Sequence, residues 1–121
     1  MTKISELGPR SRGIDLKVKL VEKRDERQVT ARATGQQHRV AEFLVADDSG
    51  SVLLSLWDDS IDSVEIGASY EIKNAYVNVF KNSMKLNTGK YGTMEKIEEE
   101  VEANTELNIS EKFVDNPGRR F

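Results

Sequence analysis

The chain has 121 residues, with 18 Lys and Arg against 21 Asp and Glu, and a net charge of −3. A chain of this length fits one domain with a core of its own, and because it has no cysteine it holds no disulfide, thiolate metal site or thiol nucleophile. No apolar run reaches the length of a signal peptide or a membrane span, so we expect a soluble, intracellular protein without a membrane partner.

The acidity is concentrated at the C-terminal end. Residues 1–92 hold 14 Lys and Arg against 13 Asp and Glu, whereas residues 93–121 hold 4 against 8. We therefore predict a nearly neutral domain over 1–92 and a separate acidic segment over 93–121.

After an entry segment over 1–13, apolar residues at every second position of 14–20 predict a half-buried strand. The polar stretch that follows predicts a solvated loop or a strand continued outward as a hairpin arm, with Gly35 at its turn. Its arginines, offset by nearby acids, could instead contact a polyanion: Arg24, Arg27, Arg32 and Arg39.

Two further strands are predicted over 39–46 and 51–57, joined by a turn over 47–50. In the later strand Val52, Leu54 and Leu56 share one face, which leaves Ser55 and Trp57 on the other. A lone Trp is more often core than ligand-binding, so this strand leaves both interpretations of Trp57 open. Residues 58–66 predict a short helix capped by Asp59 or Ser60 and stopped by Gly67.

Residues 72–91 contain four lysines and no acid, and they alternate as a hairpin whose tip is residues 81–82. Counting back from the tip pairs Phe80 with Ser83 and Tyr76 with Asn87. One face of this hairpin is apolar, and the other mixes rings, amides and a lysine. These rings either pack under a loop or offer stacking surfaces to unpaired bases.

The final segment changes character again. Residues 93–104 predict a helix with Met94, Ile97 and Val101 on one side, either packed on the domain or part of a partly flexible tail. The acidic segment could also fold over the lysines of 72–91. Five strands with one brief helix between the third and fourth predict an all-β fold, the five-stranded Greek-key barrel of the OB-fold.

The stretches 42–59 and 72–92, with Gly67 between them, resemble the single-OB-fold single-stranded DNA-binding proteins of archaea, which are related to small animal sensors of single-stranded DNA. The resemblance runs from Ile4 to Ile97. It implies base stacking on Trp57, Tyr76 and Phe80, a role in replication, recombination or repair, and an archaeal cytoplasm. Family members often carry an aromatic where this chain has Asn87, so the outermost stacking position differs.

The remaining candidate contacts surround these rings. Asn78, Asn87 and Ser55 share the proposed face and could hydrogen-bond. Phosphate contacts are expected from lysines, and from two arginines whose direction depends on the strand: Lys73, Lys81, Lys85, Lys90, Arg32 and Arg39.

No catalytic or metal-binding pattern accompanies these residues. We expect His38 to be merely solvated and the paired aspartates to serve turns and helix caps, so no cofactor, metal or enzymatic activity is predicted. The function predicted is sequence-independent binding of single-stranded DNA by a monomer, with the tail a candidate contact for repair or replication proteins. An RNA-binding OB module and a protein-interaction subunit are the alternatives.

Overall fold

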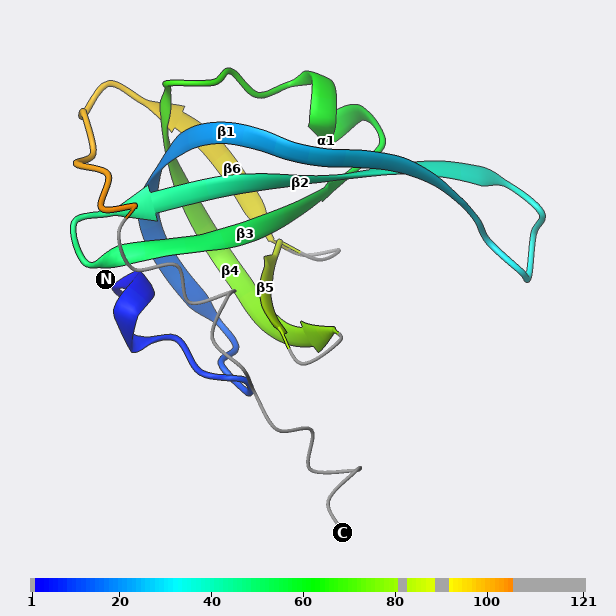
Figure 1. The fold of residues 1–121 in the computed structure, drawn as a ribbon, viewed down its shortest axis with the longest axis horizontal. Helices are drawn as coiled ribbons and strands as arrows, with labels where there is room; N and C mark the ends of the chain where they lie inside the picture. Colours follow the sequence, from blue (N-terminus) through cyan, green and yellow to red (C-terminus); the bar gives the residue numbers. More distant parts are fainter. Residues whose placement is uncertain (1, 81–82, 89–91, 106–121) are drawn as a thin grey trace, which may run out of the picture.

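Six strands form one sheet, which closes on itself because β1 pairs with both β2 and β4. The computed structural model describes residues 2–80, 83–88 and 92–105, apart from the side chain of Phe80. Its elements follow one another along the chain as shown in Figure 1: η1 (Ile4–Glu6), β1 (Ile14–Thr30), β2 (Gln37–Asp47), β3 (Gly50–Trp57), α1 (Asp59–Asp62), β4 (Ser69–Phe80), β5 (Ser83–Asn87) and β6 (Thr93–Ile97).

The strand order is β1-β2-β3-β5-β4-β6, and the β1–β4 pairing closes the first five strands into a barrel. The β3–β5 pairing is parallel, and every other pairing is antiparallel. This arrangement, with α1 between β3 and β4, is the OB-fold predicted from the sequence. Asp58 occupies the N-cap position of this helix without a side-chain capping hydrogen bond, and neither Asp59 nor Ser60 takes that position as expected.

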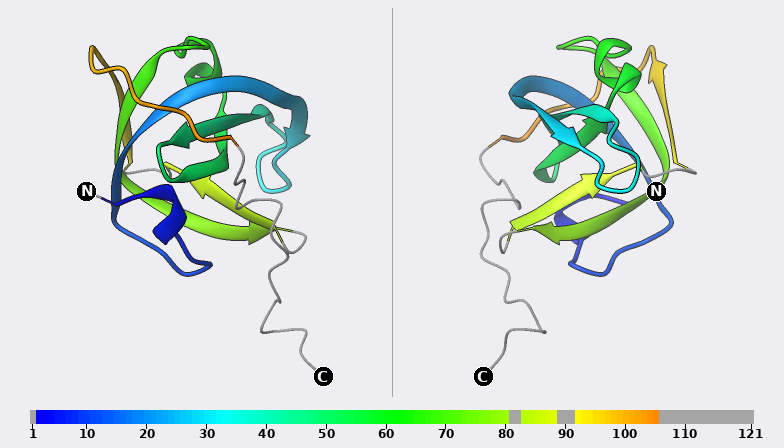
Figure 2. Two further views of the ribbon diagram at one scale, coloured as in Figure 1. Left: turned by 60° about the vertical axis from the view of Figure 1, so that its left-hand side comes forward. Right: turned by 90° about the vertical axis from the view of Figure 1, so that its right-hand side faces the viewer.

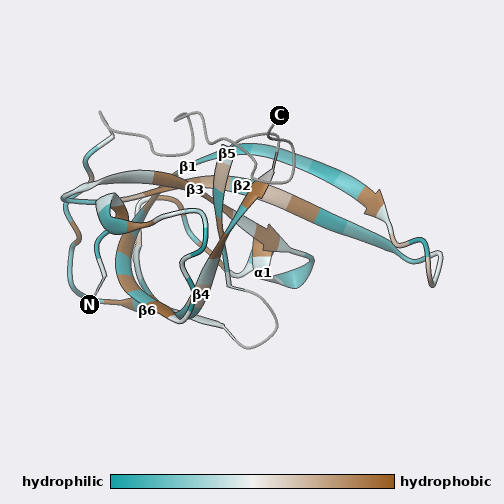
Figure 3. Cartoon of the chain, turned by 90° about the horizontal axis from the view of Figure 1, so that it is seen from below, coloured by the Kyte–Doolittle hydropathy of each residue, from teal (hydrophilic) through white to brown (hydrophobic). Residues whose placement is uncertain are grey.

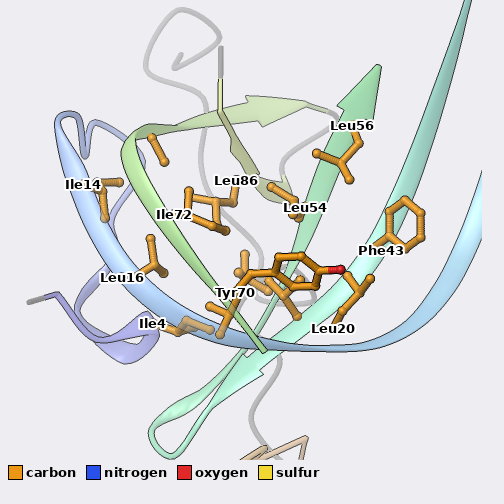
Figure 4. Packing of buried hydrophobic residues seen from close by; sticks show 14 of the residues in the cluster. Ile4, Ile14, Leu16, Leu20, Phe43, Leu54, Leu56, Tyr70, Ile72 and Leu86 are labelled. Atoms are coloured by element: carbon orange, nitrogen blue, oxygen red, sulfur yellow. The ribbon is translucent and has the colours of Figure 1, made fainter. Parts of the chain in front are cut away.

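The barrel interior is filled by the residues that alternate inward along each strand (Figure 4). Leu16, Val18 and Leu20 of β1 are fully buried, and Leu54 of β3 and Ile72 of β4 meet them. Ile4 of η1 is also fully buried, so the entry segment contributes to the core. Period-two alternation therefore decides which side chains face outward and remain available for a site.

β4 serves both halves of the barrel because it bends at Asn74. Its first half pairs with β1 and β6, and its second half pairs with β5. Asn74 has a φ of 56°, which Asn tolerates better than most residues, and its N–H donates to Asp15 Oδ1 at 2.9 Å. The β4–β5 register is the predicted one, with Phe80 opposite Ser83 and Tyr76 opposite Asn87.

β1 and β2 continue beyond the barrel as a two-stranded arm, residues 22–40, which extends far to one side in Figure 1. Figure 1 shows its tip standing clear of the barrel, Figure 2 views the arm nearly end-on, and Figure 3 shows that most of it is hydrophilic. The solvated-loop interpretation is thus wrong, because strand pairing runs out to Thr30 and Gln37. Ion pairs along the arm, including Arg24 with Glu22, balance its charges.

The helix predicted over 93–104 is also wrong. Residues 93–97 form β6, which pairs with residues 69–73 of β4, and Met94 packs against the core. Helix propensity is a weak preference, and here pairing the backbone groups at the β4 edge outweighs it. The sheet therefore continues beyond residue 92, where we expected the domain to end.

Residues 98–104 lie across the outside of the barrel. Glu99 pairs with Lys17 at 2.8 Å and Glu100 with Lys19 at 3.5 Å, both on β1. Val101 is buried and its N–H donates to Ser69 Oγ at 3.0 Å. Glu99 and Glu100 therefore contact lysines of β1. They do not cover the lysines of 72–91, over which we considered that the acidic segment could fold. Within the described ranges no helix is long and apolar enough to cross a bilayer.

Candidate nucleic-acid interface

The outer face of β2, β3, β5 and β4 carries the candidate site in cross-strand rows. One row runs Glu42, Ser55, Asn87, Tyr76 from β2 to β4. Beside it, Val40 of β2 lies opposite Trp57 at the end of β3. Side chains directly opposite one another in a sheet lie within contact distance, so residues far apart in the sequence meet here.

A groove of about 360 Å³ opens on this face. It receives residues from the β1–β2 arm on one side and from the β4–β5 hairpin on the other. Five predicted site residues line it, namely Ser55, Trp57, Asn78, Lys85 and Asn87. They are joined by Arg27, which was considered only as a possible polyanion contact, and by three residues that were not predicted: Val29, Val40 and Glu42.

Two of the three predicted stacking rings, Trp57 and Tyr76, lie outside the core. Trp57 is 48% exposed and Tyr76 is 37% exposed, whereas buried Tyr70 uses its hydroxyl to accept the Glu65 N–H at 2.7 Å. The core interpretation of Trp57 and Tyr76 is therefore excluded. Their stacking role stays a prediction, as does that of Phe80, whose side chain lies outside the described residues.

The groove holds two cations that share one carboxylate. Lys85 Nζ lies 2.6 Å from Glu42 Oε2, and both side chains are largely covered, at 14% and 15% exposure. Because β3 lies between β5 and β2, the Lys85 side chain crosses β3 to reach Glu42. Arg27 NH1 lies 3.7 Å from Glu42 Oε1 and 3.2 Å from Asp25 Oδ2. The three groove charges sum to one positive charge.

Two amides complete the groove lining. Asn87 Nδ2 donates to Asn78 Oδ1 at 2.8 Å, which leaves the Asn87 carbonyl and the Asn78 amino group to face a ligand. Asn87 is only 8% exposed. A small, covered amide therefore lies beside Tyr76, at the position where the resemblance implied an aromatic ring.

Arg39 is placed differently from its predicted role. Its guanidinium makes two contacts to Asp62 of α1, at 2.8 and 3.2 Å, and contacts Glu26 of the arm at 3.1 Å. Hydrogen bonds to Asp62 and then Glu26 raise the pKa of Arg39 above its ordinary value. Arg39 therefore ties the arm to α1, and is committed to carboxylates before any phosphate arrives.

The other predicted cations are dispersed. Arg32 is exposed at the arm turn, and Lys73 is exposed opposite Thr93 of β6; neither lines the groove. Lys81 and Lys90 lie outside the described residues. The predicted lysine stripe is thus represented in the described groove by Lys85.

Asp58 fixes the chain immediately after Trp57. Its carboxylate accepts the Arg39 backbone N–H at 2.9 Å and contacts His38 Nδ1 at 2.9 Å. These contacts, the Arg39 N–H first and His38 second, lower the pKa of Asp58. His38 is half-buried and hydrogen-bonded, so the expectation that it is merely solvated is wrong.

The sequence contained a signal for the residues that were missed. The turn over 47–50 fixes the β2–β3 register, and counting back from it sets Glu42 opposite Ser55 and Val40 opposite Trp57. The same count would have identified Glu42 and Val40 as residues of this face. Arg27 and Val29 reach the groove from the arm. Their positions depend on how the arm twists, and local sequence patterns do not determine that twist.

The barrel, its open aromatic groove and the adjacent cations define the class of OB-fold proteins with a binding face on the outer sheet. Residues 7–96 match the family described as single-stranded DNA binding protein Ssb-like, OB fold. The chain therefore belongs to this family.

Individual relatives agree with this assignment. The single-stranded DNA binding protein Ssb of Saccharolobus solfataricus is 29% identical over 87 residues, which cover 72% of this chain and 57% of that protein. An uncharacterized Arabidopsis thaliana protein is 29% identical over 101 residues, covering 77% of this chain and 66% of that protein. The chain thus spans less than two thirds of either curated relative. A solution structure of a hypothetical A. thaliana protein has a TM-score of 0.79 at 25% identity, covering 95% of this chain and 86% of that one.

Proposed function

We propose that this protein binds single-stranded DNA without catalysis and largely without regard to sequence. The observation that carries the proposal is Trp57, half-exposed at the rim of a groove that also holds cations and amides. An exposed indole beside a channel is a stacking surface, and every base offers a flat apolar face to it. The family membership and the name of the Saccharolobus relative support the same ligand.

Stacking gives the bulk of the affinity in this proposal. Trp57 and Tyr76 lie on different strands, β3 and β4, with β5 between them, so they meet different bases of one strand. Phe80, two positions after Asn78 in the sequence of β4, is the third stacking residue of the proposal. Each such contact is worth about 1 to 3 kcal/mol.

The charged and polar groups position the backbone of the ligand. Arg27 and Lys85 can each turn a donor toward a phosphate, and the Asn78–Asn87 pair offers one donor and one acceptor to a base edge. Every base carries adjacent donors and acceptors, which suits binding that tolerates many sequences.

The biological setting is part of the proposal and rests on the family. We place the protein in replication, recombination or repair in an archaeal cytoplasm, acting as a monomer, with the acidic segment 93–121 a candidate contact for a protein partner. RNA is the rival ligand, because rings and cations do not distinguish the two sugars.

Titration of the fluorescence of Trp57, the one Trp in the chain, tests the proposal. Oligo-dT should quench it with saturating affinity, and a duplex of equal length should not, because paired bases cannot reach the ring. Competition with oligo-rU in the same assay decides between DNA and RNA. Equal response to single strand and duplex, or no response to either, would refute the proposal.

A further inference from the structure

Glu42 is an acid at the centre of a groove proposed to hold a polyanion. It lines the groove beside Ser55 and Trp57 and is only 15% exposed. A carboxylate facing phosphates would weaken binding, so its position calls for a different ligand group.

The two oxygens of Glu42 differ in their partners. Oε2 holds Lys85 at 2.6 Å, which fixes the side chain. Oε1 lies 3.7 Å from Arg27, beyond hydrogen-bonding distance. Oε1 therefore retains the capacity to accept a hydrogen bond.

The position of this oxygen relative to Trp57 suits the edge of a base. Glu42 lies opposite Ser55 of β3. Ser55 precedes Trp57 by two residues, so the Glu42–Ser55 pair lies about 7 Å along the strand from Trp57. A pyrimidine stacked on Trp57 would therefore extend its edge over the Glu42–Ser55 pair.

We propose that Glu42 is a specificity-determining residue of this site: it accepts a hydrogen bond from the exocyclic amino group of a stacked base, and so favours cytosine over uracil or thymine. This proposal rests on the proposed function. Carboxylates accept from cytosine N4, whereas uracil and thymine carry a carbonyl oxygen at the same ring position, which a carboxylate repels. The result is a bias within otherwise sequence-tolerant binding.

Deoxycytidine and deoxyuridine oligomers of equal length test the proposal, because they differ at ring position 4 and lack the methyl group of thymine. Titrations of the full chain at pH 8 should show about five- to tenfold tighter binding of the cytidine oligomer, the scale of the net contribution of one hydrogen bond made in exchange for water. An oligomer of N4,N4-dimethyldeoxycytidine, which lacks the amino donors, should bind the unmodified protein as weakly as the uridine oligomer.

Glu42→Gln tests whether the carboxylate of Glu42 accepts the hydrogen bond from the cytosine amino group. The Lys85 ammonium would select the carbonyl of the new amide and turn its NH2 toward the groove, where it suits a carbonyl oxygen. The cytidine preference should vanish or reverse. Glu99→Gln removes the same charge from an ion pair with Lys17 that does not line the groove, and it should keep the preference.

The outcomes separate the two proposals. A cytidine preference lost in Glu42→Gln and in the dimethylated oligomer, and kept in Glu99→Gln, supports the role of Glu42. Equal affinity for the cytidine and uridine oligomers, or a preference that survives Glu42→Gln, overturns that role and leaves single-strand binding intact. Failure of both oligomers to bind the unmodified protein refutes the proposed function itself.

Discussion

Replacing Trp57 with Leu isolates the stacking face of the groove. Because Trp57 is 48% exposed, about half of its side chain, of the order of 100 Å², is covered by protein. Leu keeps part of that contact, so the loss of folding stability should be about 1 kcal/mol at 25 cal/mol per Å². The protein should remain folded.

The effect of this substitution on binding should be larger. Loss of one stacked base costs about 1 to 3 kcal/mol, which corresponds to about 5- to 150-fold weaker affinity. Fluorescence anisotropy of a labelled oligo-dT measures it without the indole. Ile66→Ala is the matched control, since Ile66 is 56% exposed and does not line the groove. Unchanged affinity in Trp57→Leu would refute stacking at this position.

Three further predictions concern charge, backbone and pH. The logarithm of the affinity should fall with log salt at a slope of about −1.4, from the two groove cations at about 0.7 each; a flat response in salt titrations would remove phosphate contacts from the account. Gly92→Ala should lower the free energy of unfolding by about 1 to 3 kcal/mol, because a Cβ there would clash with the Thr88 carbonyl oxygen; an unchanged urea midpoint contradicts this. The Arg39 guanidinium lowers the pKa of Asp62, so the stability from this pair is present above pH 4 and lost as pH falls below about 4. Asp62→Asn should flatten that acid loss in urea titrations, and an identical pH profile would contradict the assignment.

Strand alternation made most of the barrel predictable. The hairpin register around residues 81–82 followed from counting, because a one-residue slip would have turned Val77 and Leu86 to solvent. Alternation also put Trp57 on the face opposite Val52, Leu54 and Leu56, which occupy the inner face of β3; whether the indole was exposed on that face stayed open until the structure was known.

The errors arose where distant partners decide local structure. Residues 93–97 have helical composition, but the open edge of β4 at 69–73 pairs with them as a strand. Arg39 was predicted to contact phosphate because local sequence patterns do not reveal its carboxylate partners. These are Asp62 and Glu26, which are 23 and 13 positions away in the sequence. Charge pairs of this kind are set by the path of the arm, and that path is a tertiary property.

NMR mapping on the isotopically labelled chain tests the location of the site most directly. Addition of oligo-dT should shift the Trp57 indole N–H and the backbone amides of Ser55, Asn78 and Asn87. The amides of Lys17 and Val101, which do not line the groove, should stay in place. Shifts centred on Lys17 and Val101, with the Trp57 indole unmoved, would contradict the account.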